Sequence, residues 1–172
     1  LNGLRAIAAL SVLFSHTTMG LSSFGLNSHI FGSYPDGNPK ATLLAGFGVT
    51  IFFALSGFLI TYLLLEEKRT KEINIKNFYI RRILRIWPLY YLYFILSILT
   101  LILFDLPFEK PSILFYIFLS ANIPFIFGGA INFLEHYWSL GVEEQFYSFW
   151  PWVIKKSKSI LTPLAVNFHG YE

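Results

Sequence analysis

Cysteine is absent from this sequence of 172 residues, and charged residues are few. Without cysteine the chain has neither a disulfide framework nor a thiolate metal site. Asp, Glu, Lys and Arg make up 13% of the residues, roughly half the share of an ordinary soluble domain. Hydrophobic residues make up 55% and aromatic residues 19%. This composition excludes a typical soluble globular domain and predicts an integral membrane protein.

Five apolar stretches divide the chain, at residues 4–24, 41–65, 86–104, 112–127 and 146–154. The first three are long enough to span, because about 20 helical residues cross a hydrocarbon core of ~30 Å. The fourth is short, and the fifth has nine residues unless it extends back through WSLGVEEQ, which would bury two glutamates. We therefore predict an all-α, polytopic transmembrane helix bundle with about four or five membrane segments. A signal peptide is the competing interpretation of the first stretch, but no small-x-small cleavage pattern follows it.

The segment between the second and third stretches predicts the orientation. We expect it to be a loop, and it contains Lys68, Arg69, Lys71, Lys76, Arg81, Arg82 and Arg85. Short loops rich in Lys and Arg stay in the cytoplasm, so the N-terminus is expected inside and residues 25–39 outside. By the same rule Lys155, Lys156 and Lys158 are expected in the cytoplasm, so the chain has to return there before residue 155. A re-entrant or incompletely crossing segment at 112–127 would allow this return. Alternatively, a fifth crossing helix could leave those lysines outside.

Arg5 and His16 are the polar outliers of the first stretch, eleven residues apart. On a helix they lie about 20° apart around the axis and roughly 16 Å apart along it. In one interpretation Arg5 anchors the helix at the headgroups and His16 bonds to a neighbouring helix. In the other, His16 in an apolar wall beside a polar cavity acts as a general base toward a hydroxyl.

Three further groups of residues are candidate sites. The small residues Gly46, Gly48, Ser56 and Gly57 favour close helix packing, and Ser56 lacks the strand-turn-helix context of a nucleophile elbow. Arg81, Arg82 and Arg85 could anchor the topology or bind phosphates. Glu143 and Glu144 are either a loop acid pair at the interface or a buried group paired with Arg or His.

Four segments together resemble the acyltransferase family 3 of integral membrane proteins. They read, in order, LNGLRAIAALSVLFSH, GVTIFFALSGFLIT, NFYIRRILRIWPLYYL and HYWSLGVEEQFYSFWP. The resemblance covers most of residues 1–152 and implies about ten membrane helices in the full family. Residues 1–172 are therefore expected to be the N-terminal part of a single membrane acyltransferase domain. Asn2 stands where the family motif often has Asp, so a charge partner of Arg5 is missing or supplied elsewhere.

The resemblance implies site residues. The Arg-x10-His pair falls on Arg5 and His16, and the Arg-x-x-Arg element falls on Arg82 and Arg85. The WSLxVE motif falls on Trp138, Ser139, Leu140 and Glu143. His16 is expected to be the base or a transient acyl carrier, with Arg5 orienting the donor or stabilising the oxyanion. Arg82 and Arg85, with Arg81 beside them, are expected to bind the donor, and Glu143 to orient His16 or an arginine.

The implied reaction is O-acyl transfer, acetyl in the first instance, from cytoplasmic acyl-CoA to a carbohydrate hydroxyl. The family modifies surface polysaccharides, lipopolysaccharide O-antigens and peptidoglycan, which implies a bacterial inner membrane. No metal and no tightly bound cofactor are expected; acyl-CoA is a substrate. A transporter or flippase and a catalytically inert scaffold are the alternatives. Nucleic acid is not an expected partner, because the basic run lies against a membrane span.

Overall fold

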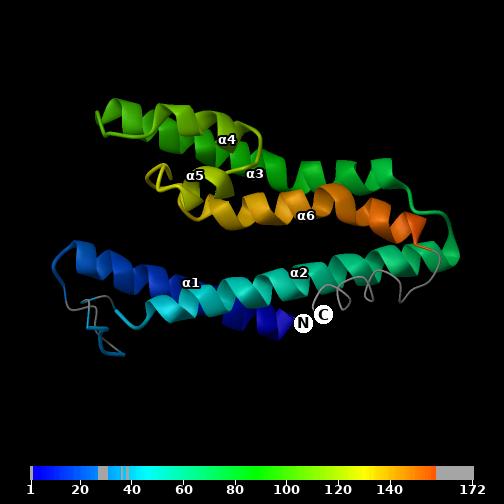
Figure 1. The fold of residues 1–172 in the computed structure, drawn as a ribbon, viewed down its shortest axis with the longest axis horizontal. Helices are drawn as coiled ribbons and strands as arrows, with labels where there is room; N and C mark the ends of the chain where they lie inside the picture. Colours follow the sequence, from blue (N-terminus) through cyan, green and yellow to red (C-terminus); the bar gives the residue numbers. More distant parts are fainter. Residues whose placement is uncertain (1, 27–30, 36, 38, 158–172) are drawn as a thin grey trace, which may run out of the picture. The chain divides into compact units, whose positions relative to one another are not determined.

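The computed structural model describes residues 2–26, 31–35, 37 and 39–157, and in this part of the chain it has helices and no strand. The helices are α1 (Asn2–Ser23), α2 (Thr42–Thr70), α3 (Ile75–Leu103), α4 (Ile113–Ile117), α5 (Asn122–Ile126) and α6 (Tyr137–Lys156), with a short 3-10 helix at Lys110–Ser112 (Figure 1). Helices α1, α2 and α3 are long and apolar enough to cross a membrane. This confirms the all-α class and gives a helix of sufficient length for each of the first three expected spans.

The chain forms two compact units, residues 1–63 and 64–172. In the first unit α2 packs against α1 at Gly48. A Cβ atom there would lie 2.7 Å from the Ala8 carbonyl oxygen and 2.7 Å from Val12 Cγ2. A Cβ atom at Gly46 or Gly57 would have no such neighbour within 4 Å among the described residues. The close approach expected of the small-residue seam is therefore observed at Gly48.

The expectation that the basic segment between the second and third spans forms a loop was wrong. Helix α2 continues to Thr70 and α3 begins at Ile75, so residues 71–74 alone connect them. Asn74 caps α3, since its side chain accepts a hydrogen bond of 2.9 Å from the Asn77 amide. Hydropathy marks where a helix leaves the apolar core rather than where it ends, and Glu, Lys and Arg are good helix formers. Arg82 and its neighbours thus belong to the first turns of α3.

The fourth apolar stretch is not one continuous helix. It breaks into α4 and α5, with Leu119 between them in the left-handed region at φ 57°. Tyr90 donates a hydrogen bond of 2.8 Å to the Tyr116 carbonyl, and Tyr91 donates one of 2.8 Å to the Ile117 carbonyl. Irregular backbone at membrane depth is tolerated only when the protein satisfies its polar groups. The tyrosines of α3 do this for the end of α4.

Helix α6 lies beside α3 and runs in the opposite direction (Figure 1). At one end Tyr137 donates to the Tyr90 carbonyl at 2.8 Å. At the other, Lys155 Nζ donates to the Ile73 carbonyl at 3.2 Å and Lys68 Nζ to the Ile154 carbonyl at 2.7 Å. The fifth stretch thus extends back through WSLGVEEQ as one helix of 20 residues. Its C-terminal lysines return to the 71–74 turn, whereas Lys158 lies outside the described residues.

Candidate functional site

An ion pair joins α3 and α6 where the two helices run side by side. Arg82 Nε lies 3.2 Å from Glu144 Oε1, and the two side chains are only 16% and 14% exposed. Arg82 lies two turns into α3, and Glu144 two turns into α6. Removing one partner from such a buried pair leaves an uncompensated charge, which costs about 3–5 kcal/mol. The pair therefore fixes the register of the two helices.

The Arg82 guanidinium also lies over an aromatic ring of α6. Its Cζ atom is 3.1 Å from the centre of the Tyr147 ring, a cation–π contact. The Tyr147 hydroxyl in turn donates to Glu143 Oε2 at 3.4 Å. Glu144 thus holds Arg82 directly, and Glu143 is joined to the same group through Tyr147.

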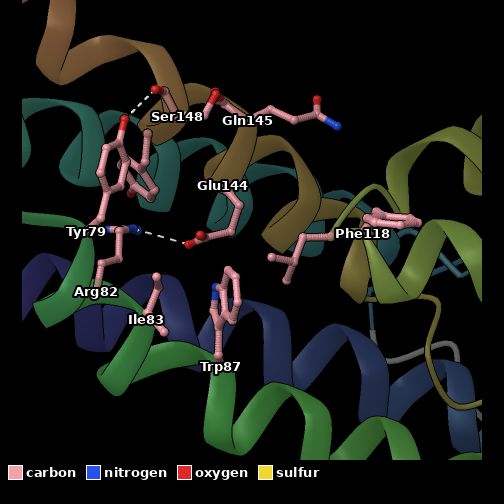
Figure 2. A pocket seen from close by; sticks show the side chains of 10 residues that line it. Tyr79, Arg82, Ile83, Trp87, Phe118, Glu144, Gln145 and Ser148 are labelled. Atoms are coloured by element: carbon pink, nitrogen blue, oxygen red, sulfur yellow. Dashed lines mark hydrogen bonds and ion pairs between the residues drawn. The ribbon is translucent and has the colours of Figure 1, made fainter. Parts of the chain in front are cut away.

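A cavity of about 340 Å³ opens beside this ion pair. It is lined by Tyr79, Arg82, Ile83, Trp87, Phe118, Leu119, Glu144, Gln145, Tyr147 and Ser148. Figure 2 shows the side chains of Arg82, Glu144 and Trp87 converging on it. The Trp87 indole nitrogen is buried and has no hydrogen-bond partner among the described residues. The cavity therefore combines a largely apolar wall with the Arg82–Glu144 ion pair.

The other two arginines lie elsewhere. Arg85 lines a second cavity, of about 400 Å³, together with Ile86, Leu89, Tyr90, Tyr93, His136, Tyr137 and Leu140. Arg81 lines neither cavity and lies 3.8 Å from Glu67, with 64% of its side chain exposed. The three arginines therefore do not form one cluster. Arg82 pairs with Glu144, Arg85 lines the second cavity, and Arg81 is exposed near Glu67.

The WSLxVE motif holds the short helix α5 against α6. Trp138 stacks on Phe125 with ring centres 5.4 Å apart, and Ser139 Oγ donates to the His136 carbonyl at 3.0 Å. At Gly141 a Cβ atom would lie 2.9 Å from Asn122 Oδ1. Within this motif Trp138 and Gly141 thus act in packing, while Leu140 lines the second cavity.

Arg5 and His16 lie on one helix, as expected. Helix α1 includes both without interruption, and the Arg5 side chain is partly buried while His16 is exposed within the described residues. The buried polar groups of α1 are instead Ser15 and Thr18, and Thr18 Oγ1 donates to the Ser15 carbonyl at 2.7 Å. The expected contact between Glu143 and His16 stays a prediction.

Two buried phenols connect the start of α6 and the segment before it to α3 and α4. Tyr137 donates to the Tyr90 carbonyl at 2.8 Å, and Tyr116 donates to the Leu134 carbonyl at 3.4 Å. Tyr116 also accepts a bond of 3.1 Å from the Ile131 amide.

Sequence reasoning did not find Tyr79 or Tyr147 as cavity residues. A signal was present, because Tyr79, Ile83 and Trp87 recur every four residues and share the α3 face that includes Arg82. The choice of Glu144 rather than Glu143 as the arginine partner had no such signal. Adjacent helical residues point about 100° apart, and only the packed neighbour decides which one meets Arg82.

Comparisons with known proteins place the chain in a family. Residues 1–166 match the family described as an acyltransferase domain. The O-acetyltransferase OatA of Staphylococcus aureus (strain NCTC 8325 / PS 47) is 35% identical over 166 residues, which cover 90% of this chain and 24% of that protein. The peptidoglycan O-acetyltransferase OatA of Listeria monocytogenes is 30% identical over 166 residues, covering 88% and 23%.

The chain thus spans about a quarter of the length of these curated relatives. No solved structure matches it. With the family match extending over nearly all of the sequence, the chain belongs to the acyltransferase family 3.

Proposed function

We propose that this chain forms part of a membrane enzyme that transfers an acetyl group from acetyl-CoA to a hydroxyl of peptidoglycan. The observation that supports it most is the similarity to a peptidoglycan O-acetyltransferase over 88% of the chain. It favours peptidoglycan over a lipopolysaccharide O-antigen as acceptor. We place the protein in the bacterial plasma membrane, with the N-terminus and the 71–74 turn in the cytoplasm, because the basic residues gather there.

In the proposed reaction the His16 imidazole takes the proton of the acceptor hydroxyl. The hydroxyl oxygen then attacks the thioester carbonyl carbon, and the negative charge moves to the carbonyl oxygen. When this intermediate collapses, the carbon–sulfur bond breaks and coenzyme A leaves as a thiolate. The imidazolium returns the proton to the sulfur, so the enzyme is regenerated. Alternatively the imidazole carries the acetyl group transiently before passing it to the acceptor.

The spacing on α1 favours one of the two roles suggested for Arg5. Eleven residues along a helix amount to about 16 Å, which is too far for Arg5 and His16 to contact the same reacting carbonyl. We therefore assign Arg5 to orienting the donor near the cytoplasmic end. The basic end of α3, with Arg81, Arg82 and Arg85, is assigned to donor binding from the same side.

The test uses membrane vesicles that contain the protein and labelled acetyl-CoA, with label in the cell-wall glycan as the readout. His16→Ala should reduce transfer at least a hundredfold, since a positioned general base contributes about 10²–10⁴-fold. Thr17→Ala is the matched control, because Thr17 is next to His16 and its hydroxyl donates to the Leu13 carbonyl of its own helix at 2.9 Å. Normal acetylation by the His16 variant would exclude the catalytic assignment. Uptake of label without transfer to glycan would favour a transporter instead.

A further inference from the structure

We propose that a pocket between the 71–74 turn and the C-terminal end of α6 binds the headgroup phosphate of an anionic phospholipid in the cytoplasmic leaflet. This lysine pocket has a volume of about 300 Å³. It is lined by Lys68, Lys71, Glu72, Ile73 and Lys155. The inference goes beyond the proposed function, because neither the acyl donor nor the acceptor takes part. It adds a membrane lipid to the partners of this chain.

The lysine pocket lies where α6 leaves the apolar part of the membrane. Lys155 directly follows the apolar stretch 146–154, and hydrogen bonds join this end of α6 to the end of α2 and to the turn before α3 (Figure 1). Trp152 lies one turn before Lys155 on the same helix face and is 48% exposed. Tryptophan is enriched at the headgroup level of a bilayer. The lysines of the pocket are therefore at the depth of the lipid phosphates.

Two of the lysines are held in place by backbone carbonyls. Lys68 Nζ donates to the Ile154 carbonyl at 2.7 Å and also to the Ser157 carbonyl, at the end of α6. Lys155 Nζ donates to the Ile73 carbonyl at 3.2 Å. An ammonium group has three N–H donors, so each of these two lysines keeps at least one for a ligand. Because both side chains are already ordered, a ligand loses little affinity to their immobilisation.

The charge of the lysine pocket favours an anion. Its three lysines face a single acid, Glu72, whose side chain is 94% exposed and lies 3.9 Å from Lys155. An ion pair as exposed as this one is weak, so it leaves most of the positive charge for a ligand. The ammonium group of Lys71 has no ion pair or hydrogen bond with the described residues. A phosphodiester, with one negative charge and two free acceptor oxygens, suits such a group of ammonium donors.

The positive-inside rule alone does not explain why these lysines converge. It requires basic residues on the cytoplasmic side, and Lys76 in the first turn of α3 meets that requirement without lining the pocket. Lys68, Lys71 and Lys155 come from α2, from the turn and from α6, yet they line one pocket. Basic pockets between membrane helices on the cytoplasmic side bind the headgroups of anionic lipids. The arrangement therefore favours a bound lipid over a diffuse surface charge.

The experiment measures binding of single lipids to the detergent-solubilised protein by native mass spectrometry. Phosphatidylglycerol is the anionic probe, and phosphatidylcholine with the same acyl chains is the zwitterionic probe. Phosphatidylglycerol should bind at least about tenfold more tightly. Lys71→Gln should raise the Kd of phosphatidylglycerol about fivefold, the effect of one lysine at a membrane surface, and change that of phosphatidylcholine less than about twofold.

Two variants serve as controls. Lys76→Gln removes the same charge from the same side of the membrane without altering the pocket, so the Kd of phosphatidylglycerol should change less than about twofold. Lys71→Arg keeps the charge and should bind phosphatidylglycerol as the unmodified protein does. Since the Lys71 ammonium has no described partner, all three variants should melt with the unmodified protein.

Four results would overturn the assignment. The first two are equal binding of the two lipids and an unchanged Kd in the Lys71→Gln variant. The third is an equal loss of binding in the Lys76→Gln control, which would indicate a diffuse field. The fourth is release of phosphatidylglycerol by an equal concentration of inorganic phosphate or coenzyme A, because the pocket would then take a soluble phosphate. None of these outcomes depends on acetyl transfer, so a failure of the lipid assignment leaves the proposed function standing.

Discussion

Glu144→Ala should destabilise the protein strongly, because it leaves the mostly buried Arg82 charge without its ion-pair partner. Removing one partner of a buried pair costs about 3–5 kcal/mol. Arg82 keeps its contact with the Tyr147 ring at 3.1 Å and remains 16% exposed, so we expect the lower end, about 3 kcal/mol. For a chain of this size 1 kcal/mol corresponds to about 2–4 °C, which gives a decrease in Tm of about 6–12 °C.

The assay is thermal unfolding in detergent, followed by circular dichroism of the helices. Glu66→Ala is the control, because Glu66 pairs with Arg69 at 3.4 Å on the surface, where its side chain is 50% exposed. A pair of this kind contributes about 0–1 kcal/mol, so the control should melt within about 3 °C of the unmodified protein.

A double variant tests the reason for the effect. Arg82→Met combined with Glu144→Leu removes both charges and fills the space with apolar side chains, which is often neutral for stability. It should therefore melt above the Glu144→Ala variant. The reasoning would be refuted by a Glu144→Ala protein that melts with the unmodified one, or by a double variant that melts as low as Glu144→Ala.

Three other changes test the packing and the topology. Gly48→Ala should destabilise by about 1–3 kcal/mol, because the new Cβ would lie 2.7 Å from the α1 backbone, whereas Gly46→Ala has free space and should be neutral or stabilising by Tm. Tyr116→Phe should lower stability by about 1–3 kcal/mol, because it leaves the buried Ile131 amide without its acceptor, whereas the Leu134 carbonyl keeps its bond from the Tyr137 amide; an unchanged Tm would contradict this. Since the chain has no cysteine, a single introduced cysteine reports on which side of the membrane its position lies. Lys156→Cys should react with an impermeant thiol reagent from the cytoplasmic side, and Phe127→Cys from the outer side. Labelling of both positions from one side would contradict the topology.

Hydropathy predicted α1 and the apolar parts of α2 and α3 because uncharged runs of helix length have few alternatives in a membrane. It could not predict where α2 ends and α3 begins, since the charged residues between them still form helix and only the Asn74 cap marks the turn. The break at Leu119 was equally hidden. The break depends on hydrogen bonds that the tyrosines of α3 donate to carbonyl groups at the end of α4, and an apolar run of sequence does not show such bonds.

The candidate site shows a similar division. The sequence identified Arg82 and the two adjacent glutamates as residues of interest, because charges in apolar segments are rare. It could not choose between the glutamates, nor foresee that Arg82 and Arg85 would line different cavities, because both outcomes depend on how α3 and α6 are rotated against each other. The unpaired indole of Trp87 is likewise a property of the packed structure alone.

The ion pair also explains why α6 looks unlike a membrane helix by composition. It is not among the helices apolar enough to cross, yet its 20 residues reach about 30 Å, and hydrogen bonds join its two ends to the turn before α3 and to Tyr90. An estimate from composition counts each glutamate as an isolated charge. Inserting an isolated Asp or Arg at the centre of a membrane helix costs about 2.5–3.5 kcal/mol. Glu144 is instead neutralised by Arg82 on α3, and that arginine needs a counter-ion for the same reason. Each helix therefore supplies the charge that neutralises the buried charge of the other. We expect α6 to insert into the membrane together with α3, as a pair.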